Sequence, residues 1–150
     1  MESFSFSDDP HTPGISNTDR WTWIDALYLA PPPFAALAKA TGNDGYQRFV
    51  DREFKPVFDT LYDKEEKLFY RDDRFIGMRT PNGKKIFWSR GNGWVFAGLP
   101  LLLNQVPPGY PMRDFYVGPF REMAPAVLAA QQPDGSWFPS LKDPQYIPLP

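Results

Sequence analysis

The chain has 150 residues, of which 42% are hydrophobic and 23% charged, a balance typical of a folded globular domain. Its net charge is −2, with no basic run and no long apolar segment, which argues against a nucleic-acid partner and against a membrane span. The chain has no cysteine and one histidine, His11, so no disulfide framework, metal site or cofactor is predicted.

Residues 1–17 predict an extended lead-in, because Ser, Asp, Pro and Thr recur there without a helical or strand period. The first residues lack the positive segment and the apolar segment of a signal peptide, so a cytoplasmic location is expected. A helix is predicted from Arg20, with Thr18 or Asp19 as its cap and Asp25 in its first turn. Pro31–Pro33 should interrupt or kink this helix.

Asp25 is a candidate general acid. Two tryptophans, Trp21 and Trp23, precede it, and Leu27 and Tyr28 follow it. Such neighbours should partly desolvate the carboxyl group and raise its pKa toward values useful for proton transfer. The alternative is that Asp25 only stabilises the helix N-terminus electrostatically.

Further elements follow along the chain. Gly42 predicts a helix C-cap, and a three- and four-residue apolar spacing from Tyr46 to Leu61 predicts a long amphipathic helix. The Asn-Gly pair at 82–83, flanked by Leu68-Phe-Tyr and Lys85-Ile-Phe-Trp, predicts a small β-hairpin near 68–87. A last helix is predicted around residues 116–127, and residues 141–150 should form a loop.

The segment from Trp88 to Trp94 places one cation, Arg90, and two glycines between two indoles. Because a helical apolar spacing begins at Val95, this segment predicts a helix entrance with Asn92 as the N-cap. A helix N-terminus beside a guanidinium group favours an anionic ligand. A glycine loop with two core tryptophans is the alternative.

The order of these elements occurs twice, offset by ~70 residues, as expected for helical hairpins that share one continuous core with their neighbours. The chain is therefore predicted to be all-α. Two such hairpins leave apolar faces uncovered, so the chain should either self-associate or form a portion of a closed ring of hairpins.

Four segments together resemble the family 105 glycoside hydrolases, the unsaturated rhamnogalacturonyl hydrolases, which are related to the family 88 unsaturated glucuronyl hydrolases. These segments are residues 20–32, 37–42, 82–94 and 131–137. The resemblance implies an (α/α)6 barrel of six helical hairpins, of which residues 18–150 would form the middle portion. It places the active site at the entrances of the inner helices.

The resemblance also implies a reaction. Asp25 would protonate the double bond of a terminal 4,5-unsaturated uronic acid and activate water for its hydration, and the resulting hemiketal would open and release the neighbouring sugar. The expected substrate is a pectin-derived rhamnogalacturonan oligosaccharide. The candidate substrate contacts are Trp21, Trp23, Tyr70, Arg71, Trp88, Arg90, Asn92 and Trp94.

Two other functions stay open: removal of unsaturated glucuronyl groups of the family 88 type, and sugar binding by helical hairpins without catalysis. The second cleft aspartate of the family would lie upstream of residue 1, and Tyr70-Arg71-Asp72 stands where many members carry a histidine. Four prolines, at 56, 100, 119 and 125, fall inside expected helices. The isolated chain is therefore expected to be marginally stable or prone to aggregation, which puts its activity in doubt.

Overall fold

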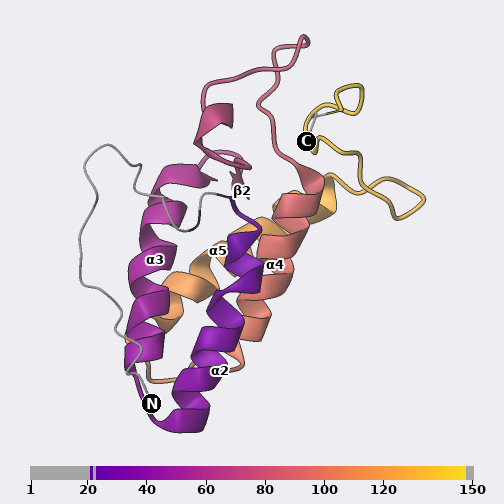
Figure 1. Ribbon diagram of the computed structural model, residues 1–150. Coiled ribbons are helices and arrows are strands. Elements are labelled where there is room, and N and C mark those ends of the chain that lie inside the picture. The colour runs from indigo at the N-terminus through magenta and orange to yellow at the C-terminus, as the bar shows by residue number, and fades with distance from the viewer. Residues whose placement is uncertain (1–20, 22, 148–150) are drawn as a thin grey trace.

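The computed structural model describes Trp21 and residues 23–147 and consists mainly of two helical hairpins packed together (Figure 1). Its elements are α1 (Ala26–Leu29), α2 (Pro31–Thr41), α3 (Gly45–Leu61), β1 (Tyr62–Asp63), β2 (Leu68–Phe69), the 3-10 helix η1 (Asp73–Phe75), α4 (Ser89–Leu103) and α5 (Arg113–Ala129). The mainly helical architecture predicted from the sequence is confirmed. The predicted lead-in and the caps Thr18 and Asp19 lie outside the described residues.

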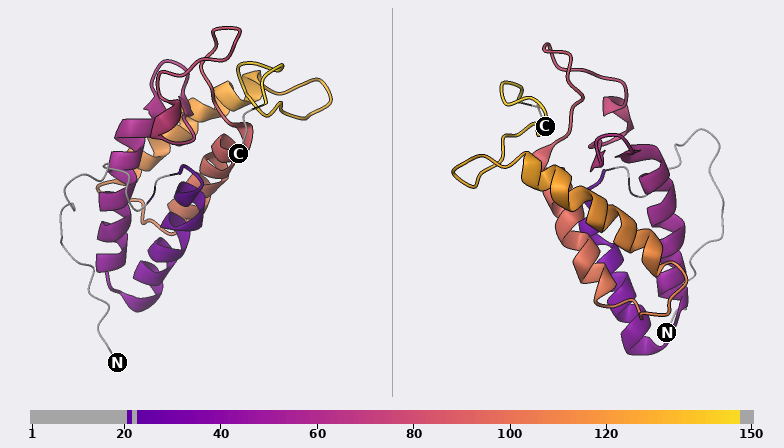
Figure 2. Two further views of the ribbon diagram at one scale, coloured as in Figure 1. Left: turned by 45° about the horizontal axis from the view of Figure 1, so that its top comes forward. Right: turned by 180° about the vertical axis from the view of Figure 1, so that it is seen from behind.

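The first hairpin joins α2 to α3 and the second joins α4 to α5, with both connections at one end of the molecule (Figures 1 and 2). The start of α1, strand β2 and the start of α4 lie toward the opposite end (Figure 1). Helix α4 packs against α1, α2 and α5, so it joins the two hairpins. Residues far apart in the sequence are thereby brought together near the N-terminus of α4.

The ends of α2 follow directly from proline and glycine. Pro31 occupies the first turn, where a missing backbone N–H costs no helical hydrogen bond, so the three prolines begin a new helix after Ala30. Gly42 ends α2 in the left-handed conformation, with φ of 68°, as the C-cap prediction requires. The long amphipathic helix predicted from Tyr46 to Leu61 is also confirmed, because α3 spans Gly45–Leu61.

The main core lies between the two hairpins and is rich in aromatic side chains. Phe54 of α3 meets Tyr116 of α5 edge-on, with 5.2 Å between ring centroids. A second, smaller cluster forms around Leu68, Tyr70 and Phe87 under the loops. In the part of the chain that the structure describes, every helix is too short or too polar to span a lipid bilayer.

Proline lies inside three of the helices, as the sequence predicts. Pro56 is in α3, Pro100 in α4, and Pro119 and Pro125 in α5. Each lacks the N–H that would bond to the carbonyl four residues earlier, so packing between the hairpins has to compensate for these losses.

Three local predictions are wrong. Strand β2 pairs with β1 across the turn at 63–66, not with residues 85–88. The predicted Asn82-Gly83 turn does form, and an isolated antiparallel bridge between Arg79 and Lys85 closes it. The turn at 63–66 is favoured because the Asp63 carboxylate accepts hydrogen bonds from the N–H groups of residues 65 and 66.

The other two concern helix starts. Helix α1 begins at Ala26, so Asp25 is its N-cap residue and does not lie in the first turn. Helix α4 begins at Ser89 with Trp88 as its N-cap residue, so Asn92 lies inside the helix and is not its cap.

Two glycines of α4 allow this helix to approach α1 and Ile24, the residue before Asp25, unusually closely. A Cβ at Gly98 would lie 2.8 Å from the carbonyl oxygen of Leu27, and one at Gly91 would lie 2.7 Å from Cδ1 of Ile24. The neighbour at Gly98 is backbone, which cannot rotate away. Glycine at position 98 therefore sets the distance between α1 and α4.

We predict that Gly98→Ala lowers the free energy of unfolding by ~1–3 kcal/mol, because its methyl group would force the two helices apart. The matched control is Gly118→Ala in α5, where a Cβ would meet nothing within 4 Å. That substitution should be neutral or add up to ~1 kcal/mol through helix propensity. Urea denaturation of both variants measures the difference, and equal effects of the two substitutions would contradict the close-approach argument.

Candidate active site

Five predicted site residues come together where α1, β2 and α4 meet. We call Trp23, Asp25, Arg71, Trp88 and Arg90 the Asp25 cluster. Trp23 and Asp25 directly precede α1, Arg71 follows β2 by two residues, and Trp88 and Arg90 stand at the start of α4. The cluster therefore depends on three separate segments of the chain.

Arg71 lies among aromatic rings. Its guanidinium carbon is 4.2 Å from the ring centroid of Trp23 and 5.5 Å from that of Trp88. Its side chain is buried and forms an ion pair with Asp72, at 3.3 Å. Asp72 also accepts two hydrogen bonds from the Arg74 side chain. The segment is thus held firmly, and Arg71 is fixed beside the indoles by cation–π contacts.

Arg90 stacks on Trp88, with its guanidinium carbon 3.9 Å from the ring centroid, and is exposed. A cation in the first turn of a helix opposes the helix dipole, a cost of ~0.3–1 kcal/mol. The contact with Trp88 offsets this cost. A guanidinium held there faces solvent and is placed to receive an anionic group of a ligand.

Asp25 is partly buried, and its Oδ1 has no hydrogen-bond partner among the described residues. Burial raises the pKa of Asp25 above the usual value for aspartate, while the positive charges of Arg90 and Arg71 act to lower it. Because the effect of burial is the larger, the carboxyl group is more easily protonated than an ordinary aspartate. A group with this balance is suited to donate a proton and then accept one.

Trp94 lies one turn after Arg90 on α4, and 39% of its surface is exposed. Its ring packs on Tyr28 of α1, with 4.7 Å between centroids. Tyr28 was not among the predicted site residues, although it lies three positions after Asp25, a spacing that places two helical residues on one face. Trp23 is similarly exposed, at 40%, so two indoles near Asp25 present surface to solvent.

Two predicted substrate contacts belong to the core. Trp21 is 7% exposed and meets Phe49 of α3 edge-on. Tyr70 is equally buried, packs on Phe87 and donates its hydroxyl hydrogen bond to Asp63. The structure therefore gives both side chains packing partners and does not include them in the Asp25 cluster.

Asn92 is fully buried, which separates it from the exposed part of the cluster. Its Oδ1 accepts a hydrogen bond from the N–H of Phe69 at 2.8 Å, and its Nδ2 donates to the carbonyl of Phe69 at 2.9 Å. The same Nδ2 donates to the carbonyl of Trp88 at 3.0 Å. The predicted ligand contact is not supported, because backbone groups occupy the polar atoms of this side chain.

The start of α4 is also held from its other side by the segment after α5. Trp88 and Ser140 form an isolated antiparallel bridge, with hydrogen bonds from Ser89 N–H to the carbonyl of Pro139 and from Leu141 N–H to that of Phe87. Nothing in the sequence around Ser140 signals this contact, since backbone pairing carries no side-chain pattern.

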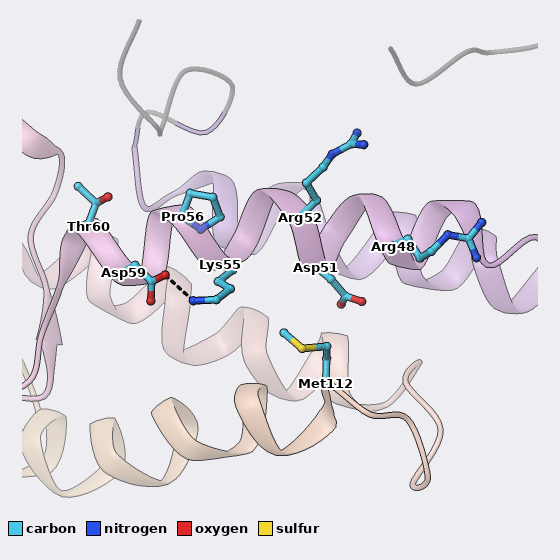
Figure 3. Close-up of a pocket in the computed structure, with 8 residues that line it drawn as sticks. All are labelled: Arg48, Asp51, Arg52, Lys55, Pro56, Asp59, Thr60 and Met112. Atoms are coloured by element: carbon cyan, nitrogen blue, oxygen red, sulfur yellow. Dashed lines mark hydrogen bonds and ion pairs between the residues drawn. The ribbon is translucent and has the colours of Figure 1, made fainter. Parts of the chain in front are cut away.

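A separate cavity of about 620 Å³ lies along α3, next to Met112 at the start of α5, and contains no residue of the Asp25 cluster (Figure 3). Its charged side chains bond within the protein. Lys55 pairs with Asp59, and Asp51 accepts hydrogen bonds from the hydroxyls of Tyr110 and Tyr116. These carboxylates therefore have structural partners, and the Asp25 cluster is the better candidate for chemistry.

The family model described as Glycosyl Hydrolase Family 88 matches residues 11–149, nearly the whole chain. The chain belongs to glycosyl hydrolase family 88. The sequence motifs resemble family 105, and family 88 is the family named as related to it.

Two relatives of this family 88 chain are both named unsaturated 3S-rhamnoglycuronyl hydrolase. The protein from Formosa agariphila is 45% identical over 131 residues, and the one from Alteromonas sp. (strain LOR) is 39% identical over 131 residues. The matches cover 83% and 87% of this chain but 35% and 32% of the relatives. The chain thus spans about a third of the length of these relatives.

The fold of the chain is similar to solved structures of family 88 and family 105. A family 88 glycosyl hydrolase from Bacteroides vulgatus superimposes with a TM-score of 0.82 at 38% identity, covering 91% of this chain and 40% of that structure. A family 105 glycoside hydrolase from C. acetobutylicum has a TM-score of 0.65 at 22% identity, over 79% of this chain and 35% of that structure, and shows the fold alone. The helical hairpins of this family 88 chain are accordingly part of an (α/α)6 barrel fold, as predicted.

We predict that Asp25→Asn raises the stability of the chain at neutral pH. The folded-state pKa of Asp25 is raised, so ionisation favours the unfolded chain, and this loss of stability grows as pH rises above the unfolded value of 3.8. An amide has no such cost. Thermal melts of both proteins should differ at pH 7 and converge below about pH 4; a gap that does not depend on pH would refute the assignment to ionisation.

Proposed function

We propose that the chain carries the catalytic acid and the carboxylate-binding side of a glycosidase that removes a terminal 4,5-unsaturated uronic acid by hydrating its double bond. The observation that carries this proposal is the Asp25 carboxyl group, partly buried and flanked by two arginines and two indoles. Membership of family 88 and the names of the two relatives support it.

The proposed chemistry needs one group that both gives and takes a proton. Asp25, protonated, donates its proton to C4 of the double bond, and the positive charge that develops at C5 is captured by water. The carboxylate left on Asp25 accepts the proton of that water. The product is a hemiketal, which opens and releases the neighbouring sugar. The raised pKa of Asp25 favours the protonated form that begins this sequence.

The uronate carboxylate requires a cation next to the reacting ring. Arg90 is exposed, stacked on Trp88 and close enough to influence the charge of Asp25. We assign to it the carboxylate of the substrate, while Trp23 and Trp94, both partly exposed, offer flat surfaces for sugar rings. Arg71 is buried and paired with Asp72, so its role is to support the indoles and the charge balance around Asp25.

The relatives' names favour a rhamnose as the sugar next to the unsaturated uronic acid. A pectin-derived rhamnogalacturonan oligosaccharide, expected from the sequence, stays a prediction. An unsaturated glucuronyl group on an amino sugar is the alternative substrate. The chain corresponds to about a third of the length of the relatives. In a barrel of their full length, other helical hairpins would complete the substrate site.

Self-association also stays a prediction. Leu29, Leu37, Leu101 and Leu128 are large apolar side chains with more than a third of their surface exposed, so the hairpins have apolar surface available for further packing.

We predict that Asp25→Asn lowers turnover by ~10²–10⁴-fold, the usual contribution of a general acid and base. The assay follows the loss of ultraviolet absorbance of the double bond in unsaturated disaccharides. One disaccharide carries rhamnose and the other an amino sugar. The matched control is Asp59→Asn, which removes an exposed aspartate paired with Lys55 on α3 and should leave turnover unchanged.

Three outcomes would count against the proposal. Full activity of Asp25→Asn would exclude Asp25 as the proton donor. Binding of saturated and unsaturated uronides alike, without turnover by the wild-type chain, would indicate a sugar-binding module. Turnover of the amino-sugar disaccharide alone would reject the rhamnose-linked substrate.

We predict that Arg90→Ala raises KM by ~10–100-fold for the unsaturated disaccharide, because a hydrogen bond to a charged group contributes ~1.5–3 kcal/mol. It should also raise the pKa of Asp25, since Arg90 lowers it, and so move the alkaline limb of the kcat profile upward in pH. Arg48→Ala, which removes an exposed arginine paired with Asp44, is the control. An unchanged KM would exclude Arg90 from carboxylate binding.

A further inference from the structure

The N-terminus of α4 is joined to strand β2 by one side chain. Asn92 both accepts from and donates to the backbone of Phe69, and it also donates to the carbonyl of Trp88. In a β-sheet, a neighbouring strand would make the two hydrogen bonds to Phe69, but here the amide group of Asn92 makes them. We call the three hydrogen bonds of Asn92 the clamp. The complete burial of this side chain means that water cannot replace them without a cost of ~1–3 kcal/mol.

Both sides of this clamp carry a cation of the Asp25 cluster. On one side, the chain continues from Phe69 to Arg71, whose carbonyl accepts a hydrogen bond from the N–H of Ile24 at 3.1 Å. On the other side, Asn92 lies two residues after Arg90 on α4. The same amide therefore connects the segment that carries Arg71 to the helix that carries Arg90, and Ile24 connects both to Asp25.

We propose that Asn92 is a positioning residue that holds the segment after β2 against the start of α4 and so sets where Arg71 and Arg90 stand relative to Asp25. The inference rests on the proposed function only for its catalytic consequence. Asn92 touches no substrate. It acts through Phe69 and Trp88, and the groups facing Asp25 whose spacing it controls are Arg71, from the segment after β2, and Arg90, from α4.

Breaking the clamp has a defined electrostatic consequence. Arg90 and Arg71 both lower the pKa of Asp25 against the effect of its burial. When the clamp is lost, the two guanidinium groups are no longer held close to the carboxyl group, while its neighbours still bury it. The pKa of Asp25 then rises further, and a loss of general stability alone would not produce this change.

The test measures Asp25 directly in the full 150-residue chain by carbon-13 NMR titration of its side-chain carboxyl group, assigned by its absence from Asp25→Asn. Asn92→Ala should raise the midpoint by ~0.5 pH unit or more, a fraction of the shift that nearby charges usually cause. The matched control is Gln47→Ala. Gln47 is another buried amide, which donates to Asp51 on α3, and its loss should leave the midpoint unchanged.

A midpoint in Asn92→Ala equal to that of the wild type would overturn the proposal and leave Asn92 a purely structural residue. If Asn92→Ala does not fold, Asn92→Asp is used, which keeps the shape and the bond from Phe69 N–H but loses both donated bonds. Its readout is amide hydrogen exchange at Ile24. The proposal expects faster exchange at Ile24 relative to Val50 in α3, and parallel changes at both positions would overturn it.

The kinetic readout separates this proposal from the proposed function. If the wild-type chain turns over the unsaturated disaccharide, Asn92→Ala should lower kcat and shift its pH profile upward. It should also raise KM, because Arg90, to which the substrate carboxylate is assigned, is no longer held in place. If the wild-type chain shows no turnover, the proposed function fails for this chain, whereas the titration of Asp25 still decides the role of Asn92.

Discussion

The close contact between α1 and α4 at Gly98 is the constraint on which the site depends. A helix with a side chain at position 98 could not approach the backbone of Leu27 so closely, and Asp25 would lie further from the start of α4. Gly91 repeats the arrangement two turns earlier, beside Ile24. The short α1 is thus held against a longer helix by missing side chains, and this places a carboxyl group beside the cations that balance its charge.

The site opposes two ordinary rules of protein stability. A partly buried carboxyl group has no hydrogen-bond partner for its Oδ1 among the described residues, and a guanidinium group occupies a helix N-terminus, where the dipole favours anions. Both arrangements lower the stability of the folded chain when no substrate is bound. In the proposed reaction, an anionic substrate would bind beside Arg90 and take a proton from Asp25, and both arrangements would then serve activity, which commonly requires a site that is less stable than it might be.

Features set by neighbouring residues in the chain could be predicted from the sequence, and features set by distant contacts could not. The extent of α3 and the cap at Gly42 follow from local spacing and from glycine conformation. Asp25, Arg90 and Trp94 were singled out by their motifs, and their roles in binding and catalysis stay predictions. Asn92 was misread because its main partner, Phe69, lies 23 residues away, and an Asn-Gly sequence before an apolar helix looks like a cap. The strand pairing of β2 was misread because the carboxylate of Asp63 makes a turn without any glycine.

The bridge between Trp88 and Ser140 makes the assembly of the site dependent on the order of synthesis. Asp25, Arg71 and Arg90 all leave the ribosome before α5 does, yet the segment that pairs with the start of α4 follows α5. A nascent chain that ends within α5 already contains every member of the Asp25 cluster. It has the hydrogen bond from Asn92 to the carbonyl of Trp88 but lacks the bridge to Ser140. We therefore expect the cluster to become fully ordered late in synthesis, after residue 140 has emerged and a long loop has closed.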